Sequence, residues 1–173
     1  MKLRFLTTIA AAFALPTLVV AQQPAAPAPT PTASPLLTME IAQTIAQEAV
    51  TKCRADGYKV TVLVVDSLNA PKFMIRDDGA GANTTDAAKM KATASIVYGR
   101  ASGPVATPPG VPAPPTLRPG SLFFGNAMNA QGGVPIMAGG ASIGAVAVSG
   151  APGGDKDAAC ANAGLAKVAD KLK

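Results

Sequence analysis

The chain has 173 residues, a formal net charge of +5 and 49% hydrophobic residues, and it contains neither His nor Trp. Without an imidazole it cannot form a Ser-His-Asp triad, and it lacks the commonest ligand for haem iron and zinc. With two Tyr and no cluster of basic residues it offers neither a stacking platform nor a phosphate-binding stripe, so we expect no nucleic-acid partner.

Residues 1–21 have the composition of a signal peptide. Lys2 and Arg4 precede an uncharged apolar stretch over residues 6–20, and the small Ala21 precedes the expected cleavage site. A membrane anchor is the alternative, but a proline interrupts the stretch, which is shorter than the roughly 20 residues that span a bilayer. We therefore predict a periplasmic or secreted protein with no stable membrane insertion after cleavage.

Residues 22–35 are rich in Pro, Ala and Thr and contain few large apolar side chains. Such a composition cannot bury enough apolar surface to offset the entropy lost on ordering. We interpret this segment as a disordered tether, followed by one folded domain over residues 36–173.

The first half of the domain predicts a helix and two strands. Thr38 is suited to cap a helix that runs through Asp56 and ends at Gly57, with apolar residues at helical spacing. Residues 59–65 are dense in β-branched residues and apolar on both faces, which is typical of a central strand, and residues 72–76 return as its hairpin partner.

A second helix is predicted over residues 86–98, capped by Thr84 or Thr85 and closed by Gly99. Residues 101–120 contain seven prolines, which exclude regular helix or central strand and indicate a long surface loop. Residues 121–126 are a weak strand candidate.

The last part predicts a hairpin and a helix. Residues 133–137 and 142–148 flank a glycine turn, and the final helix is capped by Asp155 and runs to about Lys171. Adjacent strands joined by tight turns predict an α+β domain with an antiparallel sheet and helices on its face or faces.

Cys53 and Cys160 are the only cysteines. In an exported protein two cysteines tend to pair, which would close a loop of about a hundred residues. Two separate buried thiols are the alternative.

Residues 140–144 (GASIG) match the G-x-S-x-G pattern of serine hydrolases. That motif requires a strand-to-helix turn and a base for the serine proton. Here it precedes a predicted strand in a chain without His, so we interpret it as part of a hairpin turn.

Three longer segments carry a family resemblance: VVDSLNAPKFMIRDDGA, AAKMKATASIVYGR, and GGVPIMAGGASIGAVAVSGAPGGDKDAACANAGLA. Together they resemble the GlcG/HbpS-like family, also called the haem-degrading or DUF336 domain, which also forms the C-terminal part of PduO-type corrinoid adenosyltransferases. The resemblance covers residues 36–173. Its most specific motifs are GGVPI at 132–136, VSGAPG at 148–153 and DAACANAG at 157–164.

The resemblance implies a profilin-like α+β fold, an antiparallel sheet with the N- and C-terminal helices close together. That closeness fits a bridge between Cys53 and Cys160. It also implies a homo-oligomer, and haem as the cofactor in some members, one of which is exported and assists a membrane sensor kinase. The chain departs from the family pattern at Ala147, where the family usually has Gly, and in the proline-rich segment after Arg100.

Arg76, Lys91 and Arg100 are among the basic residues within the family-like segments. They are our candidates for binding a propionate or carboxylate. The alternative is a set of solvated surface charges, or a local pair between Arg76 and Asp78. The loop over residues 149–154, before the last helix, also resembles an anion cradle, but nearby acidic residues favour a structural role.

An axial ligand to haem iron would have to be Tyr98, a methionine or an unoxidised cysteine, because the chain has no His. The alternative for Tyr98 is packing with its hydroxyl at the surface, and for the methionines it is filling the core. The methionines in question are Met74, Met90, Met128 and Met137. No carboxylate spacing indicates a metal site.

The leading hypothesis is a non-catalytic protein that binds haem or a related tetrapyrrole and that assists a sensor or uptake system. An enzyme acting on a small acidic metabolite, such as a 2-hydroxy acid, is the second hypothesis. An oligomeric scaffold or sensor partner is the third.

Overall fold

The computed structural model describes residues 36–104 and 127–173. The predicted signal peptide (1–21), tether (22–35), weak strand (121–126) and most of the proline-rich loop lie outside these residues. The elements, in chain order, are α1 (Met39–Ala55), β1 (Thr61–Asp66), β2 (Pro71–Arg76), α2 (Thr84–Tyr98), β3 (Gly133–Ala138), β4 (Ala141–Ser149), α3 (Gly154–Lys167) and a 3-10 helix (Ala169–Leu172).

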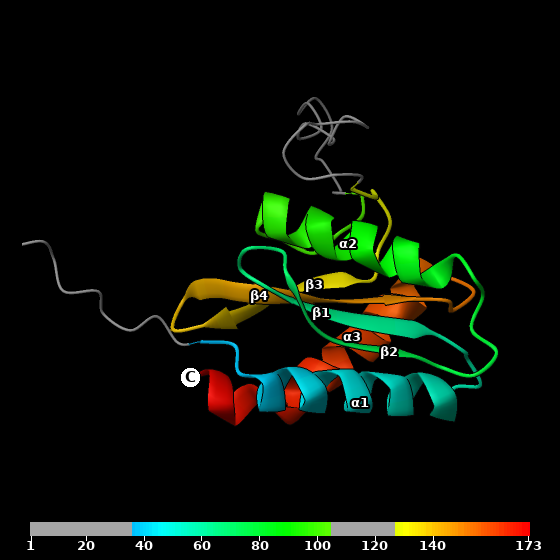
Figure 1. Ribbon diagram of the computed structural model, residues 1–173, viewed down its shortest axis with the longest axis horizontal. Helices are drawn as coiled ribbons and strands as arrows, with labels where there is room; N and C mark the ends of the chain where they lie inside the picture. Colours follow the sequence, from blue (N-terminus) through cyan, green and yellow to red (C-terminus); the bar gives the residue numbers. More distant parts are fainter. Residues whose placement is uncertain (1–35, 105–126) are drawn as a thin grey trace, which may run out of the picture. The chain divides into compact units, whose positions relative to one another are not determined.

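The four strands form one antiparallel sheet in the order β2-β1-β4-β3 (Figure 1). β1 and β4 occupy the centre, and Leu63 of β1 lies opposite Met74 on one side and Ala147 on the other. Pro135 lies in the edge strand β3, where a residue without an N–H is tolerated. The predicted α+β class is confirmed.

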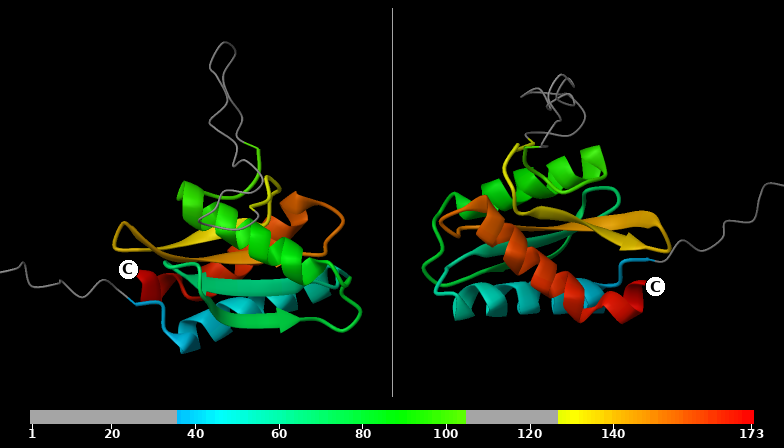
Figure 2. Two further views of the ribbon diagram at one scale, coloured as in Figure 1. Left: turned by 45° about the horizontal axis from the view of Figure 1, so that its top comes forward. Right: turned by 180° about the vertical axis from the view of Figure 1, so that it is seen from behind.

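Helices cover both faces of the sheet. α1 and α3 lie side by side on one face, and α2 crosses the other (Figures 1 and 2). Successive side chains of β1 alternate between the faces, so Val62 and Val64 pack with α1 and α3 while Leu63 and Val65 pack with α2. This alternation explains why the whole of β1 is apolar.

Small residues line the contact between α2 and the sheet. Ala88 and Ala92 of α2 share a buried cluster with Ala145 and Ala147 of β4. Ala147 is fully buried there, so the extra methyl group relative to the family's usual Gly is accommodated in the core. No helix in the described parts of the chain has the length and apolar character needed to cross a bilayer.

The start of α1 is as predicted, whereas the other two helix starts are not. Thr38 Oγ1 accepts the Ile41 N–H at 3.2 Å. α2 is preceded by Asn83 rather than capped by Thr84, because the Thr84 hydroxyl instead donates to Gly81 O at 2.7 Å from within the first turn. Thr85 is likewise inside the helix.

α3 begins two residues earlier than predicted and also ends earlier. Gly153 is its N-cap, which places Asp155 inside the first turn, where its charge favours the positive end of the helix dipole. The helix ends at Lys167, and the chain tightens into the 3-10 helix over residues 169–172 instead of continuing as α-helix to Lys171.

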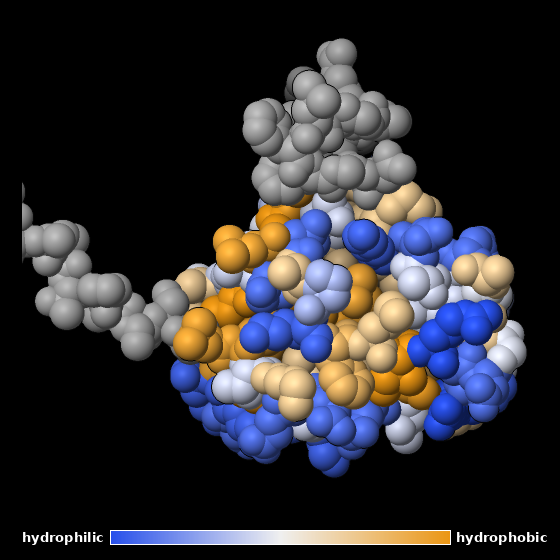
Figure 3. All heavy atoms as spheres, viewed as in Figure 1, coloured by the Kyte–Doolittle hydropathy of each residue, from blue (hydrophilic) through white to orange (hydrophobic). Residues whose placement is uncertain are grey.

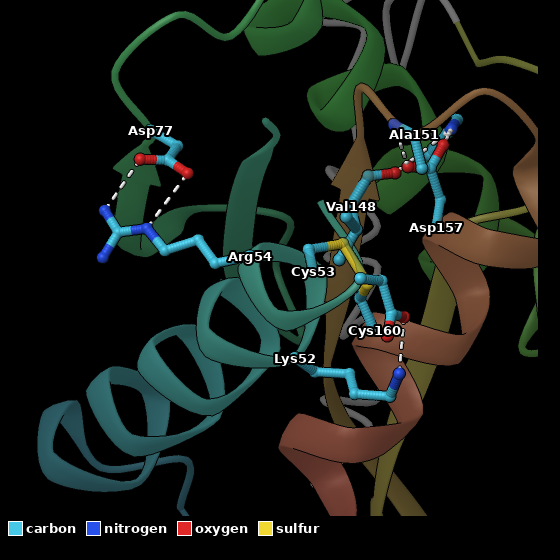
Figure 4. Close-up of a disulfide and its surroundings, with 10 residues drawn as sticks. Lys52, Cys53, Arg54, Asp77, Val148, Ala151, Asp157 and Cys160 are labelled. Atoms are coloured by element: carbon cyan, nitrogen blue, oxygen red, sulfur yellow. Dashed lines mark hydrogen bonds and ion pairs between the residues drawn. A yellow bond between two sulfur atoms is a disulfide. The ribbon is translucent and has the colours of Figure 1, made fainter. Parts of the chain in front are cut away.

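A disulfide joins Cys53 of α1 to Cys160 of α3, with their Cα atoms 5.5 Å apart (Figure 4). Both residues are fully buried in the core between the helices and the sheet. The predicted pairing is present, and the alternative of two free thiols is wrong.

Candidate functional site

A cleft of about 500 Å³ lies where the end of α2, the entry to β3 and the first turn of α3 meet. Its size falls within the range of about 300–1,000 Å³ that is usual for ligand pockets. We refer to it as the α2–α3 cleft. Its lining consists of Arg100, Ala101, Ser102, Pro104, Gln131, Gly132, Gly133, Asp155 and Ala158.

Ser102 holds two walls of the cleft together. Its backbone N–H donates to Gly133 O at 2.9 Å, and its Oγ accepts the Gly133 N–H at 2.8 Å. The same hydroxyl donates to Ala130 O at 2.6 Å. The segment that leaves α2 is therefore fixed against the segment that enters β3, which preorganises this side of the cleft.

Two glycines bring the backbone close to the groups beneath the cleft. Gly132 has a φ of 127°, and a Cβ there would lie 2.6 Å from Val148 O and 2.9 Å from Lys91 Nζ. A Cβ on Gly133 would lie 2.6 Å from Ser95 Oγ and still nearer to the backbone of α2. Only glycine fits at these positions, so the floor of the cleft is bare main chain.

A buried ion pair lies directly beneath this floor. Lys91 Nζ donates to Asp157 Oδ2 at 2.6 Å and to Val148 O at 3.1 Å. Asp157 Oδ1 accepts the Ala151 N–H at 2.9 Å (Figure 4). The side chains of Lys91 and Asp157 are 5% and 4% exposed. The pair links α2, on one face of the sheet, to α3, on the other.

Burial raises the pKa of the Asp157 carboxyl, while the Lys91 ammonium and the Ala151 amide act in the opposite direction. A carboxylate so buried depends on its cation to remain charged. Lys91, predicted as a ligand for an external acid, is neither open to the surface nor solvated. In this structure it binds the chain's own carboxylate.

Arg100 and Tyr98 form a stacked pair at one end of the cleft. The Arg100 guanidinium carbon lies 4.7 Å from the centroid of the Tyr98 ring, a cation–π distance. Arg100 Nη1 donates to Ala101 O at 2.9 Å and to Gly103 O at 3.2 Å, and these bonds hold the side chain over the segment after α2. Arg100 itself lines the cleft.

The Tyr98 hydroxyl is buried, and within the described part of the chain it has no hydrogen-bond partner. The alternative of a Tyr98 hydroxyl at the surface is therefore wrong. Ser95 Oγ, on the same side of α2, is also buried without a partner. Each such hydroxyl costs about 1–3 kcal/mol, and unpaired groups of this kind call for an explanation.

The structure separates Arg76 from the other predicted ligand residues. Arg76 ends β2 and donates to Ala80 O in the loop before α2, so the 15-residue α2, about 22 Å long, separates it from Arg100. No ion pair between Arg76 and Asp78 forms among the described residues. Arg76 therefore cannot bind the same small group as Arg100.

The methionines divide into two groups. Met74 and Met137 lie on the edge strands and are 50% and 45% exposed. Met90 and Met128 are half-buried, and the Met128 N–H donates to Met90 O at 3.1 Å. None of the four belongs to the fully buried core, so core filling does not describe them.

The GASIG segment belongs to a β-hairpin, as predicted. Gly139 and Gly140 have positive φ and form the turn between β3 and β4, so the GASIG segment lies in a hairpin. In the described ranges, 36–104 and 127–173, no three carboxylate or cysteine side chains gather as a metal site. The residues that sequence reasoning missed are Ser102 and Gln131 of the lining and Asp157 beneath it.

A second ion pair fixes the C-terminal end of α1. Asp77 accepts hydrogen bonds from Arg54 Nε at 3.0 Å and Nη2 at 2.7 Å, and its side chain is 1% exposed. These hydrogen bonds lower the pKa of the Asp77 carboxyl, against the opposing effect of burial. The pair joins the end of α1 to the loop after β2 (Figure 4), away from the cleft.

A family model described as "Haem degrading protein HbpS-like" matches residues 37–166. The chain belongs to this HbpS-like family. No curated protein sequence matches it. Among solved structures, a double mutant of Streptomyces reticuli HbpS is similar, with 29% identity and a TM-score of 0.65 over 86% of this chain and 98% of that one.

Two more distant structures share the fold. The Klebsiella pneumoniae protein ORFY, assigned to DUF336, is 23% identical, with a TM-score of 0.59 over 75% of this chain and 88% of that one. A PduOC–haem complex is 20% identical, with a TM-score of 0.62 over 76% of this chain and 94% of that one. The predicted family is confirmed.

Proposed function

We propose that this HbpS-like protein binds haem or a related tetrapyrrole in the α2–α3 cleft, and that it does so without catalysing a reaction on a metabolite. The observation that carries the proposal is the match of residues 37–166 to a haem-degrading family, together with a cleft of ligand size. The related PduOC structure contains haem. We also propose that the protein, with its ligand bound, assists a sensor or uptake system.

The residues around the cleft fit such a ligand. At Gly132 and Gly133 the floor of the cleft carries no side chain, which leaves space for a ligand, and Arg100 supplies a positive charge for a propionate. The chain has no His and both cysteines are oxidised, and Tyr98, whose ring stacks on Arg100, is not part of the cleft lining. When bound, haem would supply a redox-active iron, and the protein would supply its orientation and surroundings.

Haemin titration tests the proposal. We expect the haem absorption band to shift on binding, and Arg100→Gln to weaken binding by about tenfold, since a charge-assisted hydrogen bond contributes about 1.5–3 kcal/mol. Lys167→Gln is the matched control, because it removes one exposed positive charge at the far end of α3. Unchanged spectra of the wild-type protein at tens of micromolar haemin contradict the proposal.

We further propose that the protein is exported and that Ala21 is the last residue removed with the signal peptide. The charged start and apolar stretch of residues 1–21 support this. N-terminal sequencing of the protein from the periplasm or medium of an expressing bacterium should begin at Gln22. Retention of residues 1–21 contradicts it.

Self-association is proposed through the open edge of the sheet. An apolar groove of about 430 Å³ lies beside the edge strand β3, with Pro135 and Met137 on one side and Leu165 and Leu172 on the other. Figure 3 shows the opposite side of the molecule, where β2 is the edge strand; hydrophobic residues there lie in patches between hydrophilic ones at the level of the sheet. Sedimentation should show an oligomer, and a monomer at working concentration contradicts this part of the proposal.

A further inference from the structure

We propose that Asp155 makes the α2–α3 cleft selective for a tetrapyrrole whose metal centre carries a net positive charge. The inference rests on the proposed function and narrows its class of ligand. A trivalent metal such as ferric iron leaves a positive charge at the centre of a porphyrin dianion, whereas a divalent metal or a metal-free ring leaves none. The ligand that fits is therefore a ring with a cationic centre and an acidic edge.

The first support is a pair of opposite charges in the lining of the cleft. Arg100 belongs to the wall that follows α2, and Asp155 belongs to the wall formed by the first turn of α3. The Asp155 residue is exposed. Within residues 36–104 and 127–173 neither side chain takes part in an ion pair. Both charges are therefore available to a ligand in the cleft.

The second support is that two cations at the first turn of α3 are engaged elsewhere. Lys156, the next residue after Asp155, places its Nζ 5.5 Å from the centroid of the Tyr58 ring. Lys91 is buried beneath the floor of the cleft, where it binds Asp157. The helix dipole favours a carboxylate at this position but does not remove its charge. The α3 wall of the cleft therefore keeps the negative charge of Asp155.

The third support is the fixed position of the opposite charge. Arg100 Nη1 donates to the carbonyls of Ala101 and Gly103, and the guanidinium carbon lies 4.7 Å from the centroid of the Tyr98 ring. Among the described residues, Arg100 Nε and Nη2 donate to no protein group, so they can donate to a propionate. A ring anchored there extends toward the α3 wall. Asp155 then attracts a positive ring centre and repels a further propionate.

The test compares wild-type protein with Asp155→Asn. The affinity of each is measured for gallium(III) protoporphyrin, zinc(II) protoporphyrin and metal-free protoporphyrin, slightly below neutral pH, where the gallium centre keeps its positive charge. Relative to Asp155→Asn, the wild type should favour the gallium(III) ring by about two- to fivefold, the range expected for an exposed charge. This preference should shrink as the salt concentration rises. Arg100→Gln should weaken the binding of every ring by a similar factor, since all of them carry propionates.

Asp86→Asn is the matched control. Asp86 is also an exposed carboxylate in the first turn of a helix, but it lies at the other end of α2 from Arg100 and is not part of the lining. This variant should keep the wild-type preference.

The outcomes separate the inference from the proposed function. If every ring binds and Asp155→Asn keeps the preference for gallium(III), the role of Asp155 is overturned while the proposed function stands. A wild type that binds none of the rings overturns the proposed function as well. Asp155→Asn should still bind the metal-free ring, so a lost preference cannot be ascribed to misfolding.

Discussion

Replacing Lys91 with Met tests whether the ion pair beneath the cleft is a structural lock. The substitution keeps most of the length of the side chain but removes the cation that neutralises Asp157, whose side chain is only 4% exposed. Removing one partner of a buried pair costs about 3–5 kcal/mol, because the other charge stays buried without compensation. The unfolding constant should therefore rise by about 10²- to 10⁴-fold.

The pH dependence gives this prediction a specific signature. In Lys91→Met, burial holds the pKa of Asp157 above its ordinary value of 3.8, now without Lys91 to oppose the shift. The folded variant then binds this proton more tightly than the unfolded chain does, so its unfolding free energy rises as the pH falls from neutral toward 3.8. The deficit relative to wild type should shrink over the same range.

Urea unfolding, followed by circular dichroism from neutral pH to about pH 4, measures both effects. Lys89→Met is the matched control: Lys89 lies on the exposed side of the same helix, and its loss should change stability by no more than about 0.5 kcal/mol. A Lys91→Met protein as stable as this control at neutral pH would refute the reasoning. So would a deficit that does not vary with pH.

Three further predictions concern the scaffold. Replacing Cys53 and Cys160 together with Ala should lower the unfolding free energy by about 5 kcal/mol, because the disulfide closes a loop across a sequence separation of 107. Equal urea midpoints for the variant and the oxidised wild type would contradict this. The lowered pKa of Asp77 stabilises the fold above its ordinary pKa of 3.8 and ceases to do so as the pH falls through the folded value. Acid unfolding of Arg54→Met, which removes the main cause of that shift, should accordingly begin at a higher pH than in wild type, and an unchanged acid midpoint argues against the assignment. Gly133→Ala should destabilise by about 1–3 kcal/mol, because the new methyl group meets the α2 backbone, and a variant with wild-type melting temperature would show that the floor is looser than described.

Local patterns predict the elements of this fold well. The doubly apolar run of residues 59–65 predicts a central strand, and β1 lies between β2 and β4 with helices on both faces. Thr38 predicts the start of α1, because the capping hydrogen bond joins two residues that are only three positions apart in the sequence. Such features depend on neighbours along the chain, which the sequence displays directly.

The site depends on pairings that the sequence does not display. Lys91 and Asp157 are 66 residues apart, and no periodicity in either helix indicates that they meet. Ser102 stands in a segment with no regular structure, so its bonds to Ala130 and Gly133 have no local signature. Of the predicted ligands, Arg100 lines the cleft and Tyr98 adjoins it, while Lys91 lies beneath it and Arg76 lies beyond the other end of α2.

The most direct test of tetrapyrrole binding in the α2–α3 cleft is an amide chemical-shift titration with gallium(III) protoporphyrin, a diamagnetic stand-in for ferric haem. Shifts should concentrate at Ser102, Gln131, Gly132, Gly133 and Asp155. Shifts confined to the groove between β3 and α3, or no saturable shifts at all, would contradict the account.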